Sequence, residues 1–288
     1  MKKIIFAVCL VVAVSLSVYG VAIASQTRVP ATVGPSGQTV IIPEHAVEVA
    51  PHVFYLGEAI DPADGQMVRG YAFMLTAEAK TDSVNKPAKP VKPAVNTCYG
   101  FLASGAKWKT VENWVMNSSN PFAMDEMTVF NLLDRGINKW EDAANGVVGD
   151  GYGKNVVGAG SFTTEMLNAD ETAPDNMNEI YFGELEPGTI GVTIVWGVFG
   201  GAPKARELRE WDQVYNTYYT WSAEASGVPD KMDFDNIATH ELGHTMGLDD
   251  LYTDSCGQET MYGYGTEGET YKRDLNAGDV VGMASLYK

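Results

Sequence analysis

The chain has 288 residues, of which 45% are hydrophobic and 20% are charged. This composition is typical of a globular protein and excludes a disordered, collagen-like or coiled-coil chain. Twenty Lys and Arg residues stand against 37 Asp and Glu residues, which gives a net charge of −17. A chain this acidic is not attracted to phosphate backbones or anionic lipids, so we expect no nucleic-acid partner.

The N-terminus predicts export from the cell. The basic start Met1-Lys2-Lys3 precedes a long apolar run, which ends in the small residues Ala22-Ile23-Ala24. This pattern describes a secretory signal peptide at residues 1–24, so we expect a secreted protein with no stable membrane insertion after cleavage. The alternative is a membrane anchor, because an uncleaved segment 4–24 is just long enough to span a bilayer.

Residues 25–85 predict a small β-rich N-terminal module. Two β-like runs at 53–56 and 71–75 flank a turn sequence at 61–65, which indicates a hairpin. Residues 86–96 are rich in Lys and Pro, which is typical of an extended linker that cannot pack a core. The module is either a removed propeptide or a permanent domain, and the linker is a candidate processing site.

The remaining residues, 97–288, predict a domain with mixed helices and strands. Hydrophobic periodicity indicates a helix at 125–144 and strands at 107–116, 178–185, 189–199 and 214–221. The strand at 189–199 alternates cleanly, and it suits either an exposed edge or the interior of a sheet. The fold class that this order predicts is α+β.

Two cysteines, Cys98 and Cys256, remain after removal of the signal peptide. In an exported chain a single disulfide between them is the simplest interpretation. The alternative is that the Cys98 thiolate binds a metal in a latent form, but Cys256 would then lack a partner.

The segment 240–250 reads HELGHTMGLDD and predicts a metal site. His240 and His244 lie four residues apart, so on a helix both imidazoles project from one face and can bind one Zn²⁺. Gly247 permits the left-handed backbone that ends a helix sharply. The chain then returns Asp250 toward the metal as an oxygen ligand.

Glu241 lies beside this metal and is the expected general base. Two His and one carboxylate leave the fourth position for water, as hydrolysis requires. Asp249 is the alternative ligand if the turn opens differently. Tyr262 or Tyr264 can donate a hydrogen bond to an oxyanion, although a packing role suits either residue equally well.

These residues resemble the metzincin motif of zinc endopeptidases, with Asp250 where most members have a third His. The Asp variant is similar to snapalysin-type bacterial proteases and to secreted archaeal matrixin-like proteins. The sequence 259–264 resembles the Met-turn, in which Met261 forms an apolar floor beneath the metal. The tail 274–287 resembles the closing helix of matrixins.

The resemblance implies a metzincin-like zinc endopeptidase domain with a twisted mixed sheet, an active-site helix and a C-terminal helix. It also implies that residues 191–196 form the sheet edge that pairs with an extended peptide substrate. The usual Pro-Arg-Cys-Gly zymogen sequence does not occur near Cys98, which argues against a thiol switch. We expect a monomer.

Two other functions fit the same residues. The first is an exported surface or binding protein with a structural zinc, although such sites usually have four protein ligands. The second is a zinc amidase that acts on non-protein amides. A structural Ca²⁺ in the acidic loop 149–153 is a further possibility, and a plain turn is its alternative.

Overall fold

The computed structural model describes residues 37–77 and 97–288. The predicted signal peptide at 1–24 and the predicted linker at 86–96 lie outside the described residues. Among the described residues, no helix is both long and apolar enough to cross a membrane.

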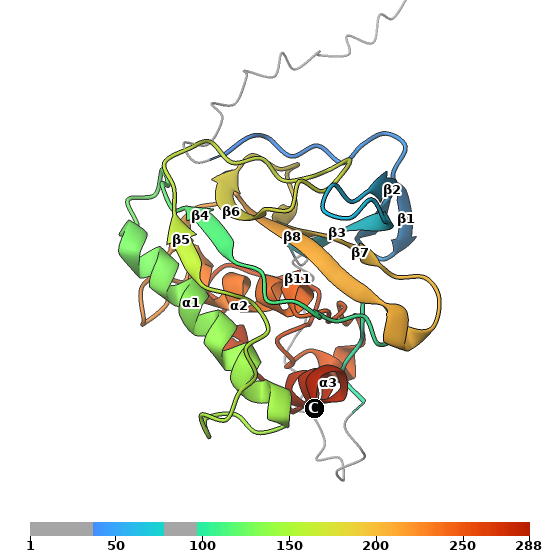
Figure 1. The fold of residues 1–288 in the computed structure, drawn as a ribbon. Coiled ribbons are helices and arrows are strands. Elements are labelled where there is room, and N and C mark those ends of the chain that lie inside the picture. The colour runs from blue at the N-terminus through green and yellow to red at the C-terminus, as the bar shows by residue number, and fades with distance from the viewer. Residues whose placement is uncertain (1–36, 78–96) are drawn as a thin grey trace, which may run out of the picture. The chain divides into compact units, whose positions relative to one another are not determined.

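In the described part of the chain, nine strands form one mixed sheet (Figure 1). Its order is β1-β2-β3-β7-β8-β6-β4-β5, and β11 pairs with β3 beside this path. The strands are β1 (Val47–Ala50), β2 (Val53–Ile60), β3 (Met67–Ala77), β4 (Trp114–Asn117), β5 (Gly160–Phe162), β6 (Asn178–Gly183), β7 (Thr189–Val198), β8 (Glu207–Asn216) and β11 (Tyr264–Gly265). Strands β5, β4, β6 and β8 are parallel neighbours, whereas β7 is antiparallel to β8. A separate parallel pair consists of β9 (Trp221–Ser222) and β10 (Met232–Asp233).

Three helices lie on one side of this sheet in Figure 1: α1 (Glu126–Asp142), α2 (Phe234–Thr245) and α3 (Ala277–Tyr287). Helix α1 begins after Asp125, whose Oδ1 accepts a hydrogen bond from Thr128 N at 2.8 Å. Its buried face follows the expected periodicity and includes Trp140, whose Nε1 donates to Thr239 O of α2 at 2.8 Å. A short 3-10 turn follows, and Gly146 ends it with φ 95°. The predicted helix at 125–144 is therefore confirmed.

The core has two parts, one on each face of the sheet. The part beneath the helices combines Phe73, Leu75, Ile180, Ile190 and Tyr215 of the strands with helix residues such as Ile237 and Leu242. The part on the opposite face includes Leu56, Ala72, Val192, Ile194, Trp196 and Val214. Both faces of β3 and β7 are therefore buried. Each large side chain that folding buries contributes about 2–3 kcal/mol.

Two of the expected strands are wrongly placed. The strand expected at 107–116 is present only as β4, which starts at Trp114. The strand expected at 214–221 is β8, which begins at Glu207 and ends at Asn216. The early residues of β8 include Glu210 and Asp212, whose carboxylates are buried, so a hydrophobicity pattern does not identify them as part of a strand. The hairpin, β6 and β7 are confirmed.

Strand β7 is not an edge, which corrects the expectation for residues 191–196. Strand β3 pairs with it antiparallel from Arg69 opposite Gly197 to Thr76 opposite Thr189. The β2–β3 hairpin thus belongs to the same sheet as the C-terminal strands. The domain boundaries, and the removal of residues 25–85 as a propeptide, stay predictions.

Candidate metal centre

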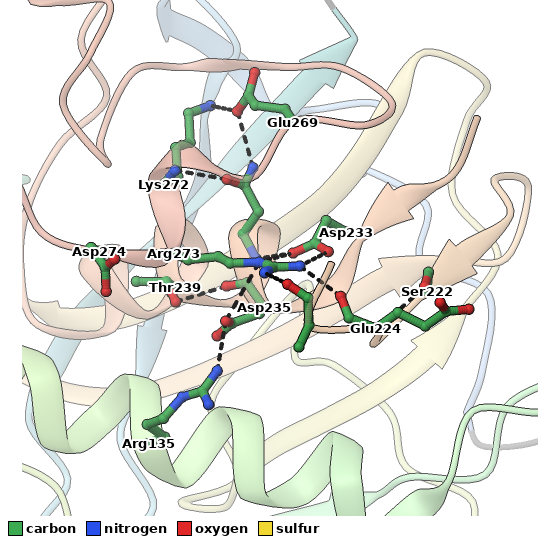
Figure 2. Close-up of polar contacts among 12 residues, drawn as sticks. Arg135, Ser222, Glu224, Asp233, Asp235, Thr239, Glu269, Lys272, Arg273 and Asp274 are labelled. Carbon is green, nitrogen blue, oxygen red and sulfur yellow. Dashed lines mark hydrogen bonds and ion pairs between the residues drawn. The ribbon is translucent and has the colours of Figure 1, made fainter. Parts of the chain in front are cut away.

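A polar network fixes the first turn of α2, the helix that carries the predicted ligands (Figure 2). Asp233 is its N-cap residue, and Oδ1 accepts a hydrogen bond from Asn236 N at 2.9 Å. Arg273 donates to both carboxylate oxygens of Asp233, with Nε and Oδ1 at 2.8 Å. Asp235 forms an ion pair with Arg135 of α1 at 2.6 Å. Charge-assisted contacts of this kind hold the helix in one orientation.

Lys272 joins the same network from inside the protein. Its side chain is fully buried, and Nζ pairs with Glu269 Oε1 at 3.2 Å and donates to Tyr264 O. Its backbone N donates to Asn236 Oδ1 at 2.7 Å. Burial lowers the pKa of Lys272, and the carboxylate of Glu269 opposes that shift. The buried cation therefore links β11 to the first turn of α2.

The two imidazoles are oriented by backbone carbonyls. His240 Nδ1 lies 2.7 Å from Thr260 O, and His244 Nδ1 lies 3.0 Å from Leu248 O. A carbonyl oxygen only accepts hydrogen bonds, so each Nδ1 carries the hydrogen and each Nε2 keeps its lone pair. Burial lowers the pKa of His244 to about 4, which keeps that ring neutral near pH 7.

The three predicted ligand atoms meet at one point. Asp250 Oδ1 lies 3.2 Å from His240 Nε2 and 3.6 Å from His244 Nε2. None of these three atoms has a hydrogen-bond partner, although all are buried. A lone pair facing a lone pair is unfavourable unless a cation lies between them. Tetrahedral zinc places its ligand atoms about 3.3 Å apart, so the donor set fits zinc.

The carboxylate of Glu241, the residue after His240, is held by β7. Thr193 Oγ1 donates to Glu241 Oε2 at 2.6 Å, while Glu241 Oε1 is buried without a partner. Burial raises the pKa of Glu241 to about 7, against the opposing effects of His240 and Thr193. A Cβ atom at Gly191 would lie 2.8 Å from Oε1, so this position has no room for a side chain.

The predicted Met-turn lies directly under α2. Met261 is buried, and a Cβ atom at Gly243 would lie 2.1 Å from its Sδ. Asp279 of α3 holds this turn, because its carboxylate accepts hydrogen bonds from Thr260 N at 2.8 Å and Met261 N at 3.3 Å. The floor of the site thus depends on close contact between a glycine and a methionine.

The turn after α2 selects between the two aspartates. Gly247 has φ 99°, as predicted, and Asp250 joins the His cluster whereas Asp249 does not. Asp249 Oδ1 instead accepts a hydrogen bond from Asp250 N at 3.0 Å. The rings of Tyr262 and Tyr264 pack against each other with centroids 5.6 Å apart. A third tyrosine, Tyr252, donates from its hydroxyl to Asp250 Oδ2 at 3.2 Å.

Cys98 and Cys256 form a disulfide across 158 residues of sequence separation. The bond attaches the start of the segment that leads to β4 to the loop between Asp250 and the Met-turn. As a disulfide-bonded residue, Cys98 provides no thiolate for a metal.

The centre is closed to solvent by the N-terminal hairpin. His240, Glu241 and His244 are each 0% exposed. The ring of Phe73, from β3, stacks on the His244 imidazole with centroids 4.7 Å apart and planes 24° apart. His52, just before β2, lies with its ring centroid 5.9 Å from that of Tyr252.

A second group of potential metal donors consists of Asp170, Glu210 and Asp212. Glu210 and Asp212 are 1% exposed, and the carboxyl groups of Asp170 and Glu210 lie within hydrogen-bond reach of each other when one of them is protonated. Burial, with the neighbouring carboxylates, raises the pKa of Glu210 to about 11. In the loop predicted for calcium, by contrast, Asp150 Oδ1 accepts a hydrogen bond from Tyr152 N at 2.9 Å, as in a plain turn.

Fold and site together define a zinc metalloendopeptidase of the metzincin type, with an α+β domain around a His, His and Asp cluster. The model of the matrixin family matches residues 112–288, which is more than half of the chain. The chain therefore belongs to the matrixin family, and the resemblance seen at residues 240–250 is confirmed. A comparison with curated proteins finds no match. Strands β1 to β3 precede the matched residues.

Proposed function

We propose that this matrixin is a secreted endopeptidase that hydrolyses peptide bonds with zinc held by His240, His244 and Asp250. The observation that supports this most is the set of three buried, unpartnered donor atoms spaced as in a tetrahedral zinc site. Secretion is proposed from the signal-like residues 1–24. The protein acts as a monomer.

The proposed reaction uses Glu241 as the general base. When bound, zinc supplies positive charge that lowers the pKa of a water molecule and polarises the scissile carbonyl. Glu241 Oε1 takes a proton from the attacking water as the new C–O bond forms. The same oxygen then delivers this proton to the leaving nitrogen as the C–N bond breaks. Thr193 holds Oε2, so Oε1 alone is available for this transfer.

The environment of Glu241 suits this double role. Burial raises the pKa of the Glu241 carboxyl group, which favours uptake of a proton from the attacking water. Asp250 contributes one negative charge and the two imidazoles contribute none, so the loaded centre has a net charge of about +1.

The two other functions predict different results. A structural zinc needs four protein ligands, whereas the group here consists of three donors, and Glu241 binds Thr193 instead. A zinc amidase would leave a peptide library intact while cleaving other amides.

We also propose a structural calcium ion at Asp170, Glu210 and Asp212. Hard carboxylate oxygens are the ligands that Ca²⁺ prefers. The three carboxyl groups are buried within reach of one another, and burial disfavours their ionised forms. One divalent ion would supply the compensating charge and displace the protons that these groups otherwise hold. This site replaces the acidic loop at 149–153 as the candidate for calcium.

The test compares the zinc-loaded wild type with Glu241→Gln, and with Glu126→Gln as a control that changes an exposed glutamate of α1. Each protein is incubated with casein and a peptide library, and its zinc content is measured. We expect Glu241→Gln to retain zinc and lose about 100-fold to 10,000-fold in rate, because the amide cannot accept the proton. A chelator should abolish the wild-type activity. Cleavage by Glu241→Gln at the wild-type rate would reject the mechanism.

A further inference from the structure

Strand β3 lies in a slot between two other strands. On one side it pairs antiparallel with β7, along eight residue pairs that end at Thr76 opposite Thr189. On the other side residues 67–73 pair antiparallel with β2, and the last two residues pair parallel with β11, the segment that follows the Met-turn. Both Thr193 and Gly191, which surround the Glu241 carboxylate, belong to β7. The slot therefore runs directly past the proposed catalytic group.

An extended peptide substrate needs such a slot, because it binds a sheet edge through its main chain and places alternate side chains in pockets. Strand β3 already does both. Phe73 stacks on His244, and two residues further on Leu75 reaches an apolar cluster with Ile190 and Ile237 beside Gly265. Leu75 is 0% exposed and Phe73 only 2%.

We propose that β3 is a substrate-like strand that keeps the enzyme latent, and that peptides reach the metal centre only when β3 leaves the edge of β7. This inference rests on the proposed function, since it names what occupies the substrate position. Three observations support it: the full burial of Glu241, the pairing of β3 on both sides, and the position of the hairpin outside the residues that the family model matches.

The device differs from a thiol switch. Cys98 is bonded to Cys256, so no thiolate of this pair reaches the metal. Latency here comes from backbone pairing and apolar side chains, and no covalent bond forms or breaks when β3 leaves. The observed rate of peptide cleavage then scales with the fraction of molecules in which the edge of β7 is open.

The first experiment destabilises β3 in the full-length, zinc-loaded protein. Leu75→Asp places a charge in the apolar cluster and should raise the open fraction about tenfold or more. Met67→Asp is the matched control, because Met67 is 54% exposed and pairs only with β2. Two rates are measured: cleavage of a fluorogenic peptide, and transfer of zinc to a chromogenic chelator. We expect both to rise about tenfold in Leu75→Asp and neither to change in Met67→Asp.

The second experiment locks β3 in place. Met74 lies opposite Val192 of β7, and both side chains line a small cavity on the face of the sheet away from the helices. The double variant Met74→Cys/Val192→Cys can form a cross-strand disulfide there. Oxidised, it should lose peptide cleavage and release zinc more slowly than the wild type. A mild reductant should restore both rates, with the wild type in the same reductant as the control.

The outcomes separate the two proposals. If the oxidised double variant cleaves peptides and releases zinc as fast as the wild type, β3 does not control the centre and the inference is overturned. If zinc release follows the lock but no form cleaves any peptide, β3 still controls access to the centre, and the proposed endopeptidase function fails. If Leu75→Asp fails to fold, the locked protein still decides between these results.

Discussion

The glycine at position 191 provides a sharp test of how Glu241 works. A Cβ atom there would lie 2.8 Å from Glu241 Oε1 and 3.4 Å from Cδ. Ordinary carbon–oxygen contacts are longer, so in Gly191→Ala the carboxylate must retreat by about 0.5 Å or more. Its other oxygen is held by Thr193 at 2.6 Å, so the group must rotate or lose that hydrogen bond. A displacement of this size at a reacting group costs about 100-fold in rate.

The assay compares peptide cleavage by Gly191→Ala and its parent, both in the Leu75→Asp background that opens the edge of β7. The proposed zinc ligands are untouched, so we expect unchanged zinc content and a loss of about 100-fold in kcat. Gly200→Ala is the control, since a Cβ atom there meets only Arg69 Nη1 at 3.7 Å. A full rate in Gly191→Ala, with zinc bound, would show that the position of Oε1 is unimportant and would refute the reasoning.

Three further predictions follow from other contacts. Tyr252→Phe removes the hydroxyl that donates to Asp250, so zinc affinity should fall about tenfold in a chelator competition, and an unchanged affinity would contradict the contact's role. Burial raises the pKa of Glu179 to about 7 and that of Asp170 to about 6, so the calcium-free protein should lose stability as pH rises from about 4 to about 7. Calcium should raise Tm at about pH 8 but have little effect at about pH 5, where these carboxyl groups are protonated. An equal effect at both pH values would count against the site. Replacing both disulfide cysteines by Ser should lower the free energy of unfolding in urea by about 5 kcal/mol under the chain-entropy treatment, whereas a change below about 1 kcal/mol would contradict it.

The cluster of His240, His244 and Asp250 is the part of the candidate site that the sequence predicts best. The geometry that unites His240 and His244 is a single helical turn, and the turn that returns Asp250 needs only the positive φ of Gly247. The residues involved lie within ten positions of one another, so their spacing in the sequence is enough to predict that they come together. The same holds for the hairpin of β2 and β3, whose turn residues are recognisable in the sequence.

The residues that complete the site are not predictable in this way. Thr193 lies 48 positions from Glu241 along the chain, and an isolated Thr in an alternating strand carries no signal of a catalytic contact. The hairpin is local, but its partner β7 lies more than 100 residues away in sequence. In the sequence, Glu210 and Asp212 look like ordinary surface charges, and only the sheet places them in the interior. Long-range pairing decides each case, and no local pattern encodes it.

The position of β3 serves stability and latency through the same contacts. An unpaired, apolar β7 would expose a sheet edge that invites aggregation, and β3 covers it. Any process that frees this edge for a substrate must therefore also remove buried side chains such as Phe73 and Leu75 from the core. The open form should be less stable than the latent one, and a bound peptide should restore part of that loss by pairing with β7. A peptide with the sequence of residues 67–77 should then raise Tm of Leu75→Asp while inhibiting its cleavage of other peptides, because both effects require occupation of one slot.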